Sequence, residues 1–355
     1  MSRPLDIVIL GLSLTSSWGN GHATTFRGLI RELTARGHRV TFLERDVPWY
    51  AAQRDLPDPP YCTTFLYQNL EQLEREHAAR VAVADAVIVG SYVPEGVLVG
   101  EWALRTARGV RAFYDIDTPV TLASVERDDC EYLTPDLIRG YDLYLSFAGG
   151  PTLERLECEF GARRARPLYC AVDPDLYFPE KGGGARWDLG YMGTYSDDRQ
   201  PPLDCLLAEP ARRRPERRFC VAGPQYPAHI TWPDNVERIE HLPPSDHRAF
   251  YNAQRYTLNI TRADMIRQGW SPSVRLFEAA ACGTPIISDW WEGLDAFFTP
   301  GEEILIARSP GDTLLYLDQF CDAERRRIGE RARKRVLAAH TAAHRAAELE
   351  AYLAE

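Results

Sequence analysis

Short apolar runs alternate with segments of helical periodicity along the first half of the chain. Residues 23–36 show the periodicity best, because Phe26, Leu29, Ile30 and Leu33 share one helix face and Gly37 is placed to end the helix. Further helical segments are predicted near 65–83, 95–107 and 152–160, and buried strands at 7–11, 40–43, 86–90, 110–114 and 141–147. This alternation predicts a parallel sheet that is covered by helices on both faces.

The rhythm breaks at residues 171–187, which contain Pro174, Pro179 and three consecutive glycines and are typical of a linker. A second β-α series follows, with strands predicted at 189–192, 219–222, 236–239, 256–260, 286–288 and 304–306. We therefore predict a first domain at 1–170, a linker at 171–187, a second domain at 188–322, and a helical segment at 323–355 that packs back on the first domain. Two such domains around a hinge suggest a cleft between them.

Composition narrows the class of protein. A chain of 355 residues with 45% hydrophobic residues suits two well-packed domains. The net charge of −10 argues against general binding to nucleic acid or to anionic membranes. The eight cysteines form no C-x-x-C pair, which argues against a structural zinc site or a redox motif.

Targeting and membrane signals are weak. The apolar run near the N-terminus is better interpreted as a first buried strand than as a signal peptide. No apolar run approaches the roughly 18 residues that a membrane helix needs. We expect a soluble cytoplasmic protein with free thiols and no integral membrane segment.

The motifs of several common enzyme classes are missing. The sequence has no G-x-x-x-x-G-K-[ST], G-x-G-x-x-G, H-E-x-x-H or G-x-S-x-G motif. Two glycine-containing loops, 16–22 and 190–199, instead follow the first strand of each predicted domain. Loops in that position bind ligands in open α/β sheets, and free amides favour anions. A tight turn without a ligand is the alternative interpretation of each loop.

The segment SPSVRLFEAAACGTPIISD, residues 271–289, predicts a helix that begins at a potential anion site. Ser271 is a good N-cap and Pro272 suits the first helical position, so the amides of Ser273 and Val274 would lack helical partners. A diphosphate would satisfy them at the positive end of the helix. Glu278 would then lie about 10 Å along the same face, within reach of a ribose. The alternative is a surface ion pair between Arg275 and Glu278 at spacing i, i+3.

The same segment resembles the donor-binding segment of GT-B glycosyltransferases, and most closely the group-1 type that includes the spore-maturation CgeB-like proteins. GNGHATTFRGLIRELTARGHRVTFLE resembles the first loop, helix and second strand of that superfamily. YCAVDPDLYFP resembles the interdomain crossing, and FCVAGPQYP a strand and loop of the donor domain. The resemblance implies an α/β GT-B fold, in which two Rossmann-like parallel-sheet domains face each other across a cleft, with C-terminal helices.

The resemblance also implies roles for individual residues. Glu278 matches the carboxylate that binds the donor ribose, and Ser271, Ser273 and Val274 match the helix end that holds the diphosphate. The remaining matches are Gly193 and Thr194 in the first donor-domain loop, Arg199 as a phosphate cation, His241 and Leu242 beside the base, and His22 where the first loop meets the cleft. One departure is Trp270, which stands where many retaining members carry a second glutamate eight residues before the first.

The candidate chemistry of the first domain lies in FYDIDTPVTL, residues 113–122. Asp115 and Asp117 follow a buried-looking strand, and their D-x-D spacing suggests a metal site. We favour no metal, because a helix N-terminus can already neutralise a diphosphate. Asp117 and His22 are the candidate catalytic residues, and the alternative for Asp117 is a role in capping a turn. Arg262 could contact phosphate or an acidic acceptor, or could be a solvated loop cation.

These observations predict a metal-independent glycosyltransferase of hexosyl type that takes its sugar from a nucleotide-diphosphate sugar and needs no cofactor. The acceptor, the anomeric outcome and the oligomeric state are left open, and nucleic acid is not an expected partner. A nucleotide-sugar epimerase of the same fold and a non-catalytic nucleotide-sugar-binding protein are the alternatives.

Overall fold

The computed structural model describes residues 3–180 and 184–355, and the chain divides into two compact units. The first unit contains Met1–Ala171 together with Ala342–Glu355, and the second contains Val172–Thr341. The predicted linker at 171–187 includes residues 181–183, which lie outside the described residues. Among the described residues, no helix combines the length and the apolar character needed to cross a bilayer.

The first unit is built on a seven-stranded parallel sheet with the strand order β3-β2-β1-β4-β5-β6-β7. Side chains alternate between its faces, so Ile7 and Ile9 join one core while Val8 and Leu10 join the other. The strands are β1 (Asp6–Gly11), β2 (Arg39–Arg45), β3 (Thr63–Tyr67), β4 (Ala86–Gly90), β5 (Val110–Asp115), β6 (Leu143–Ser146) and β7 (Ala165–Pro167).

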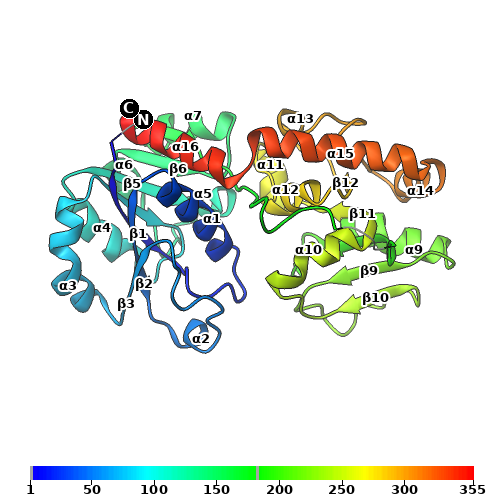
Figure 1. Cartoon of the computed structure of the whole chain (residues 1–355), viewed down its shortest axis with the longest axis horizontal. Coiled ribbons are helices and arrows are strands. Elements are labelled where there is room, and N and C mark those ends of the chain that lie inside the picture. The colour runs from blue at the N-terminus through cyan, green and yellow to red at the C-terminus, as the bar shows by residue number, and fades with distance from the viewer. Residues whose placement is uncertain (1–2, 181–183) are drawn as a thin grey trace. The chain divides into compact units, whose positions relative to one another are not determined.

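Helices cover both faces of this sheet (Figure 1). α1 and α16 lie side by side on one face, and α3 and α4 lie together on the other. The helices are α1 (His22–Ala35), α2 (Pro48–Ala51), α3 (Leu70–Val83), α4 (Gly96–Thr106), α5 (Thr118–Glu126), α6 (Pro135–Gly140), α7 (Pro151–Cys158) and α16 (Ala342–Ala354).

Two predictions about helices of the first unit can be compared with the structure. The four apolar residues predicted to share a face of α1 are all buried, and Gly37 takes the left-handed φ of 95° that suits a helix end. The predicted start of the next helix at residue 65 is wrong, because residues 65–67 belong to β3. That helix begins only after Asn69, whose Oδ1 accepts from the amide of Gln72 at 2.8 Å and so caps it.

The second unit has a six-stranded parallel sheet in the order β10-β9-β8-β11-β12-β13. The strands are β8 (Trp187–Met192), β9 (Phe219–Ala222), β10 (Val236–Ile239), β11 (Gln254–Asn259), β12 (Ile286–Ser288) and β13 (Leu305–Ile306). The helices are α8 (Gln200–Leu203), the π-helix η1 (Asp204–Ala208), α9 (Glu209–Arg213), α10 (Pro244–Asn252), α11 (Ala263–Gln268), α12 (Val274–Ala281), α13 (Leu294–Phe297), α14 (Pro310–Gln319) and α15 (Asp322–Ala339).

The small residues of α12 allow a close approach by α15. A Cβ placed on Gly329 of α15 would lie 2.1 Å from the carbonyl oxygen of Gly283, just past the end of α12. Arg333 Nε donates to the carbonyl of Ala281 at 3.1 Å and satisfies one of the last carbonyls of α12. α12 is therefore fixed from its C-terminal end, which leaves its N-terminal end to define the site described below.

The two C-terminal helices belong to different units. α15 packs on α12 in the second unit, whereas α16 packs on α1 in the first. The sequence predicts the whole of 323–355 as one segment on the first domain, and the division at Thr341 and Ala342 separates its two helices.

Candidate functional site

The N-terminus of α12 begins two residues later than predicted. Ser273, with an extended φ of −77° and ψ of 141°, is the N-cap, and Val274 is the first helical residue. The predicted cap, Ser271, is instead buried in the preceding segment, and the Ser273 side chain makes no capping hydrogen bond. Among the described residues no acceptor is found for the amides of Ser273 and Val274, so the helix keeps an end that can bind an anion.

The turn before α12 explains the shift. Gly269 and Trp270 both have positive φ, 68° and 49°, and Trp270 donates its amide to the carbonyl of Glu292 at 2.7 Å. Its indole packs on Gly293, where a Cβ would lie 2.4 Å from the ring. Trp270 therefore supports the turn through packing, at the position where the resemblance led us to expect a glutamate.

Arg275 does not form the surface ion pair that was the alternative interpretation of this segment. Its side chain is buried, donates from Nε to the carbonyl of Met192 at 2.6 Å and from Nη1 to Asn259 Oδ1 at 2.9 Å, and lies over the ring of Tyr191. It thus ties α12 to the carboxyl ends of β8 and β11. The surface-pair interpretation is wrong because both members of the supposed pair face the interior.

Glu278 is buried, with only 5% of its surface exposed, and accepts a hydrogen bond at Oε2 from the hydroxyl of Tyr251 at 3.0 Å. Burial, followed by the negative charge of Glu278, raises the pKa of both Tyr251 and Tyr177, so both phenols stay protonated. A carboxylate has lone pairs beyond those that one donor uses. Glu278 is thus held in place by a phenol while it keeps the capacity to accept from ligand hydroxyls.

The first loop of the second unit packs closely against this helix. Gly193 donates its amide to the carbonyl of Ala222 at 2.8 Å, and a Cβ there would lie 2.5 Å from the Tyr191 hydroxyl and 3.1 Å from Arg275 Nη2. Any larger residue at this position would displace the side chains of Tyr191 and Arg275. Thr194 is exposed, and its carbonyl accepts from Arg199 Nη2 at 2.6 Å.

Three arginines converge beside the loop and the helix end. Burial lowers the pKa of Arg199, and the positive charges of Arg275 and Arg262 lower it further. One carboxylate, Asp198, lies near them. Burial acts to raise its pKa, but its hydrogen bonds to Ser196 and to the amide of Ala263, together with the charges of Arg262 and Arg199, lower that pKa overall. The excess of positive charge suits a ligand that carries two phosphate groups.

His241 and Leu242 lie after β10, at the same carboxyl edge of the sheet. His241 is exposed, and the carbonyl of Leu242 lies 3.2 Å from Nε2 of His247 on α10. In the part of the chain that the structure describes, no hydrogen bond joins either residue to α12. Their predicted position beside a nucleotide base stays a prediction.

His22 and Asp117, the two candidate catalytic residues, are linked in the first unit by a residue that the sequence did not indicate. Tyr92, which follows β4, donates its hydroxyl to Asp117 Oδ2 at 3.1 Å, and its ring meets that of His22 edge-on at 5.5 Å. His22 is the first residue of α1, and burial lowers its pKa to about 4. Asp117 is half-buried and stands at the N-cap position of α5, where its carbonyl accepts from the amides of Val120 at 2.9 Å and Thr121 at 3.0 Å. Its side chain makes no capping hydrogen bond on α5, so the capping of this turn is a role of its backbone.

The D-x-D spacing of Asp115 and Asp117 does not reflect a shared ligand site. Asp115 is fully buried and accepts from Tyr144 at 2.6 Å and from Thr121 at 2.7 Å. Burial raises the pKa of Asp115 to about 6. Because both oxygens of Asp115 take part in this internal network, only Asp117 is placed to meet a substrate.

Two carboxylates, the buried Glu44 and the exposed Asp55, bind the backbone at the start of the first loop of the first unit. Glu44, fully buried at the end of β2, accepts from the amides of Leu14 at 2.6 Å and Thr15 at 2.9 Å. Asp55 accepts from the amide of Ser17 at 2.8 Å. The amides of Leu14, Thr15 and Ser17 therefore already have acceptors, and an anion at this loop would have to be bound by other amides. Sequence reasoning did not single out Glu44, although its position directly after a predicted strand is a signal that could have indicated its role in this loop.

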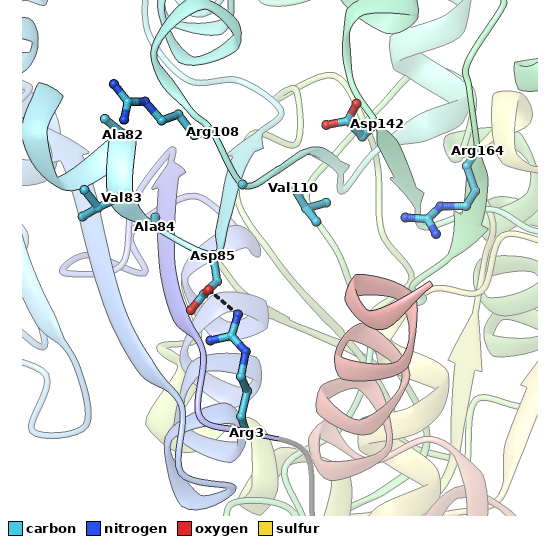
Figure 2. A pocket seen from close by; sticks show the side chains of 10 residues that line it. Arg3, Ala82, Val83, Ala84, Asp85, Arg108, Val110, Asp142 and Arg164 are labelled. Carbon is cyan, nitrogen blue, oxygen red and sulfur yellow. Dashed lines mark hydrogen bonds and ion pairs between the residues drawn. The ribbon is translucent and has the colours of Figure 1, made fainter.

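A pocket of about 530 Å³ opens elsewhere in the first unit (Figure 2). Its lining includes Asp85, Gly109, Asp142 and Arg164, each directly before a strand of the sheet, and Arg3, which forms an ion pair with Asp85 at 2.6 Å. The pocket thus lies at the amino ends of the strands. The candidate residues His22 and Asp117 lie at the carboxyl ends, where ligands bind in sheets of this kind.

Comparisons with known proteins agree with this architecture. The family described as Glycosyl transferase-like matches residues 199–351, a range that includes Arg199, Arg275 and Glu278. No curated protein sequence matches the chain.

Several solved structures are similar over almost the whole chain. Sucrose-phosphate synthase from Thermosynechococcus elongatus is 15% identical, with 99% of this chain and 98% of that chain covered and a TM-score of 0.68. HepE from Anabaena, in complex with UDP-glucose, is 12% identical, with 99% of each chain covered and a TM-score of 0.68. An alpha-glucosyltransferase in complex with UDP is 11% identical, with 99% and 100% covered and a TM-score of 0.72. The two parallel-sheet units thus form the GT-B fold, as predicted.

Proposed function

We propose that this chain is a glycosyltransferase that moves a hexosyl group from a nucleotide-diphosphate sugar to an acceptor hydroxyl, without a metal ion. The observation that carries the proposal is the grouping of a free helix end, three arginines and a buried carboxylate in the second unit. The match of residues 199–351 to the Glycosyl transferase-like family supports the same conclusion. Membership of the CgeB-like subgroup stays a prediction.

In this proposal the second unit binds the donor. The amides of Ser273 and Val274 and the guanidinium groups of Arg199, Arg262 and Arg275 hold the diphosphate, and Glu278 accepts from the ribose hydroxyls. UDP is the first nucleotide to test, because two of the similar structures contain UDP or UDP-glucose.

The transfer itself breaks the bond between the anomeric carbon and the diphosphate oxygen, and that electron pair leaves on the diphosphate. The acceptor oxygen forms the new bond to the anomeric carbon, and its proton passes to Asp117 acting as general base. The arginines and the helix end stabilise the charge that develops on the leaving group. They supply the positive charge that a metal ion would otherwise provide, which supports metal independence.

His22 completes the acceptor side of the proposal. Burial lowers the pKa of His22 to about 4, so its ring is uncharged near neutral pH. A neutral imidazole can form a hydrogen bond with the acceptor hydroxyl without adding a positive charge to the site. The eight free cysteines support the predicted cytoplasmic location, because disulfides form in oxidising compartments.

Nucleotide binding provides the direct test. UDP at about 100 times its dissociation constant should stabilise the protein by about 2.7 kcal/mol, and Glu278→Ala should lose most of that shift because the ribose acceptor is gone. Glu330→Ala, which removes an exposed carboxylate of α15 in the same unit, is the matched control and should bind like the wild type. Unchanged UDP affinity in Glu278→Ala, measured by calorimetry, would show that the donor assignment is wrong.

A non-catalytic nucleotide-sugar-binding protein is the second candidate, and Trp270 favours it. The indole occupies the position where the resemblance places a second glutamate, and it packs on Gly293 rather than presenting a carboxylate. A glycosyltransferase would transfer or hydrolyse the sugar of its donor, whereas a binding protein would not. Binding of UDP-glucose with neither transfer to a panel of acceptors nor slow hydrolysis would favour the binding protein.

A further inference from the structure

Tyr92 holds a strained backbone conformation at the carboxyl end of β4. Its φ is 62°, in the left-handed region that non-glycine residues seldom adopt. Strain of this kind persists only where the surrounding structure enforces it, and it is concentrated at functional sites. Here the enforcement comes from the packing of the side chain.

The ring of Tyr92 is held on two sides. It meets His22 edge-on, with an interplanar angle of 85°, and lies against Tyr132 at a centroid distance of 4.6 Å. Tyr132 is in turn fixed, because its hydroxyl lies 2.8 Å from Thr121 Oγ1, which also donates to Asp115. These contacts leave the Tyr92 hydroxyl directed at Asp117, 3.1 Å away.

The direction of this hydrogen bond is fixed by protonation. Burial, followed by the negative charge of Asp117, raises the pKa of Tyr92, so the phenol keeps its proton throughout the physiological range. The phenol therefore donates and the carboxylate accepts. A hydrogen bond that is donated to a carboxylate favours its ionised form.

We propose that Tyr92 is a positioning residue: its strained backbone and packed ring aim the hydroxyl at Asp117, which orients that carboxylate and keeps it ionised as the general base for the acceptor hydroxyl. This inference rests on the proposed function, because it assigns Asp117 the task of taking the acceptor proton. It adds a residue that acts through Asp117 and need not touch the substrate.

Several titratable groups lie around Asp117 and could contribute to a pH profile. Asp115 from β5 and Tyr92 from the end of β4 interact electrostatically with Asp117, and Tyr132 interacts with both Asp115 and Tyr92. His22 from α1 contacts the Tyr92 ring. Asp115, whose pKa burial raises to about 6, is the group most easily confused with Asp117 in a pH profile.

The test is Tyr92→Phe in the full-length protein, which removes the hydroxyl and keeps the ring packing. The pH profile of UDP-glucose hydrolysis, with water as the acceptor, should show its acidic limb moved to higher pH by about one unit, which is about tenfold in rate on that limb. The Kd for UDP should not change, because the proposed donor site lies wholly in the second unit. Tyr352→Phe, which removes a hydroxyl bonded to the carbonyl of Pro167 at 3.2 Å in the same unit, should leave the profile unmoved.

A second measurement does not depend on activity. Carboxyl carbon NMR titration of wild type and Tyr92→Phe should show the Asp117 resonance, identified by its loss in Asp117→Asn, titrating about one pH unit higher in the variant. This titration also separates Asp117 from Asp115. Melting temperatures of both phenylalanine variants show whether either has lost its fold.

The outcomes separate the two proposals. A shifted limb and a shifted Asp117 titration, with normal UDP binding, support the role of Tyr92. An unmoved Asp117 titration in folded Tyr92→Phe overturns it, whatever the activity. If wild type neither binds UDP nor cleaves UDP-glucose, the proposed function fails, while the titration still decides whether Tyr92 controls Asp117.

Discussion

At the residue scale, the main candidate groups are buried in the protein and do not form ion pairs at its surface. Glu278, Arg275 and His22 all lie inside the protein, although the sequence allowed a surface position for the first two. Sequence spacing could place Glu278 two turns from the helix start, but it could not show which side of α12 faces inward. Tyr92 was not predicted, because its role depends on contacts with Asp117, Tyr132 and His22, which are 25, 40 and 70 positions away in the sequence.

The buried His22 gives a prediction for the pH dependence of stability. Its pKa of about 4 in the folded protein lies below the ordinary 6.5, so the unfolded chain binds the proton more readily. Stability should therefore fall as pH drops from about 6.5 towards 4, with a loss of roughly 2 kcal/mol between pH 7 and pH 5. Glutamine does not titrate, so the stability of His22→Gln should fall by roughly 2 kcal/mol less than that of the wild type between pH 7 and pH 5.

Urea unfolding at the two pH values measures this difference. The comparison must be made between variant and wild type, because the raised pKa of Asp115 acts in the opposite direction: its folded state gains stability as pH falls through about 6. An equal pH dependence in both proteins would show that folding does not lower the pKa of His22.

At the element scale, hydrophobic patterns predicted most strands well and helix boundaries less well. β4, β9, β10 and β12 have the predicted bounds, and β4, β9 and β12 are continuous buried runs, whereas only Val236 is buried in β10. The pattern predicts helix over the end of β3 because the sequence of this strand, TTFLY, runs directly into an amphipathic segment. The cap of α12 was misplaced because two serines, Ser271 and Ser273, suit the position, and the turn at Trp270 selects the second.

The contact between α12 and α15 gives a prediction at this scale. Gly329→Ala should destabilise the second unit by about 1–3 kcal/mol, because the new Cβ would lie 2.1 Å from the carbonyl of Gly283. Gly311→Ala in α14 is the matched control, since its Cβ would meet only Ser309 Oγ at 3.5 Å and alanine favours the helix. Thermal unfolding of both variants checks this, and equal melting temperatures would mean that α15 can move away at little cost.

At the scale of the whole molecule, the proposed tasks divide between two compact units. The grouping of Arg199, Arg275 and Glu278 lies in Val172–Thr341, while His22, Tyr92 and Asp117 lie in the other unit. The two-domain organisation could be predicted from the repeated β-α pattern and the break at 171–187. The assignment of α16 to the first unit and α15 to the second could not, because both helices are rich in alanine and neither sequence indicates which sheet it packs on.

This division predicts where a nucleotide should protect the chain. On addition of UDP, amide hydrogen exchange should slow first at Ser273 and Val274 and in the loop at Gly193 and Thr194, because the proposed diphosphate contacts lie there. The same amides should exchange at the ligand-free rate in Glu278→Ala at an equal UDP concentration, since the occupancy of the site falls. Protection that is strongest around His22 and Asp117 would instead place the nucleotide in the first unit and reverse the assignment of donor and acceptor sides.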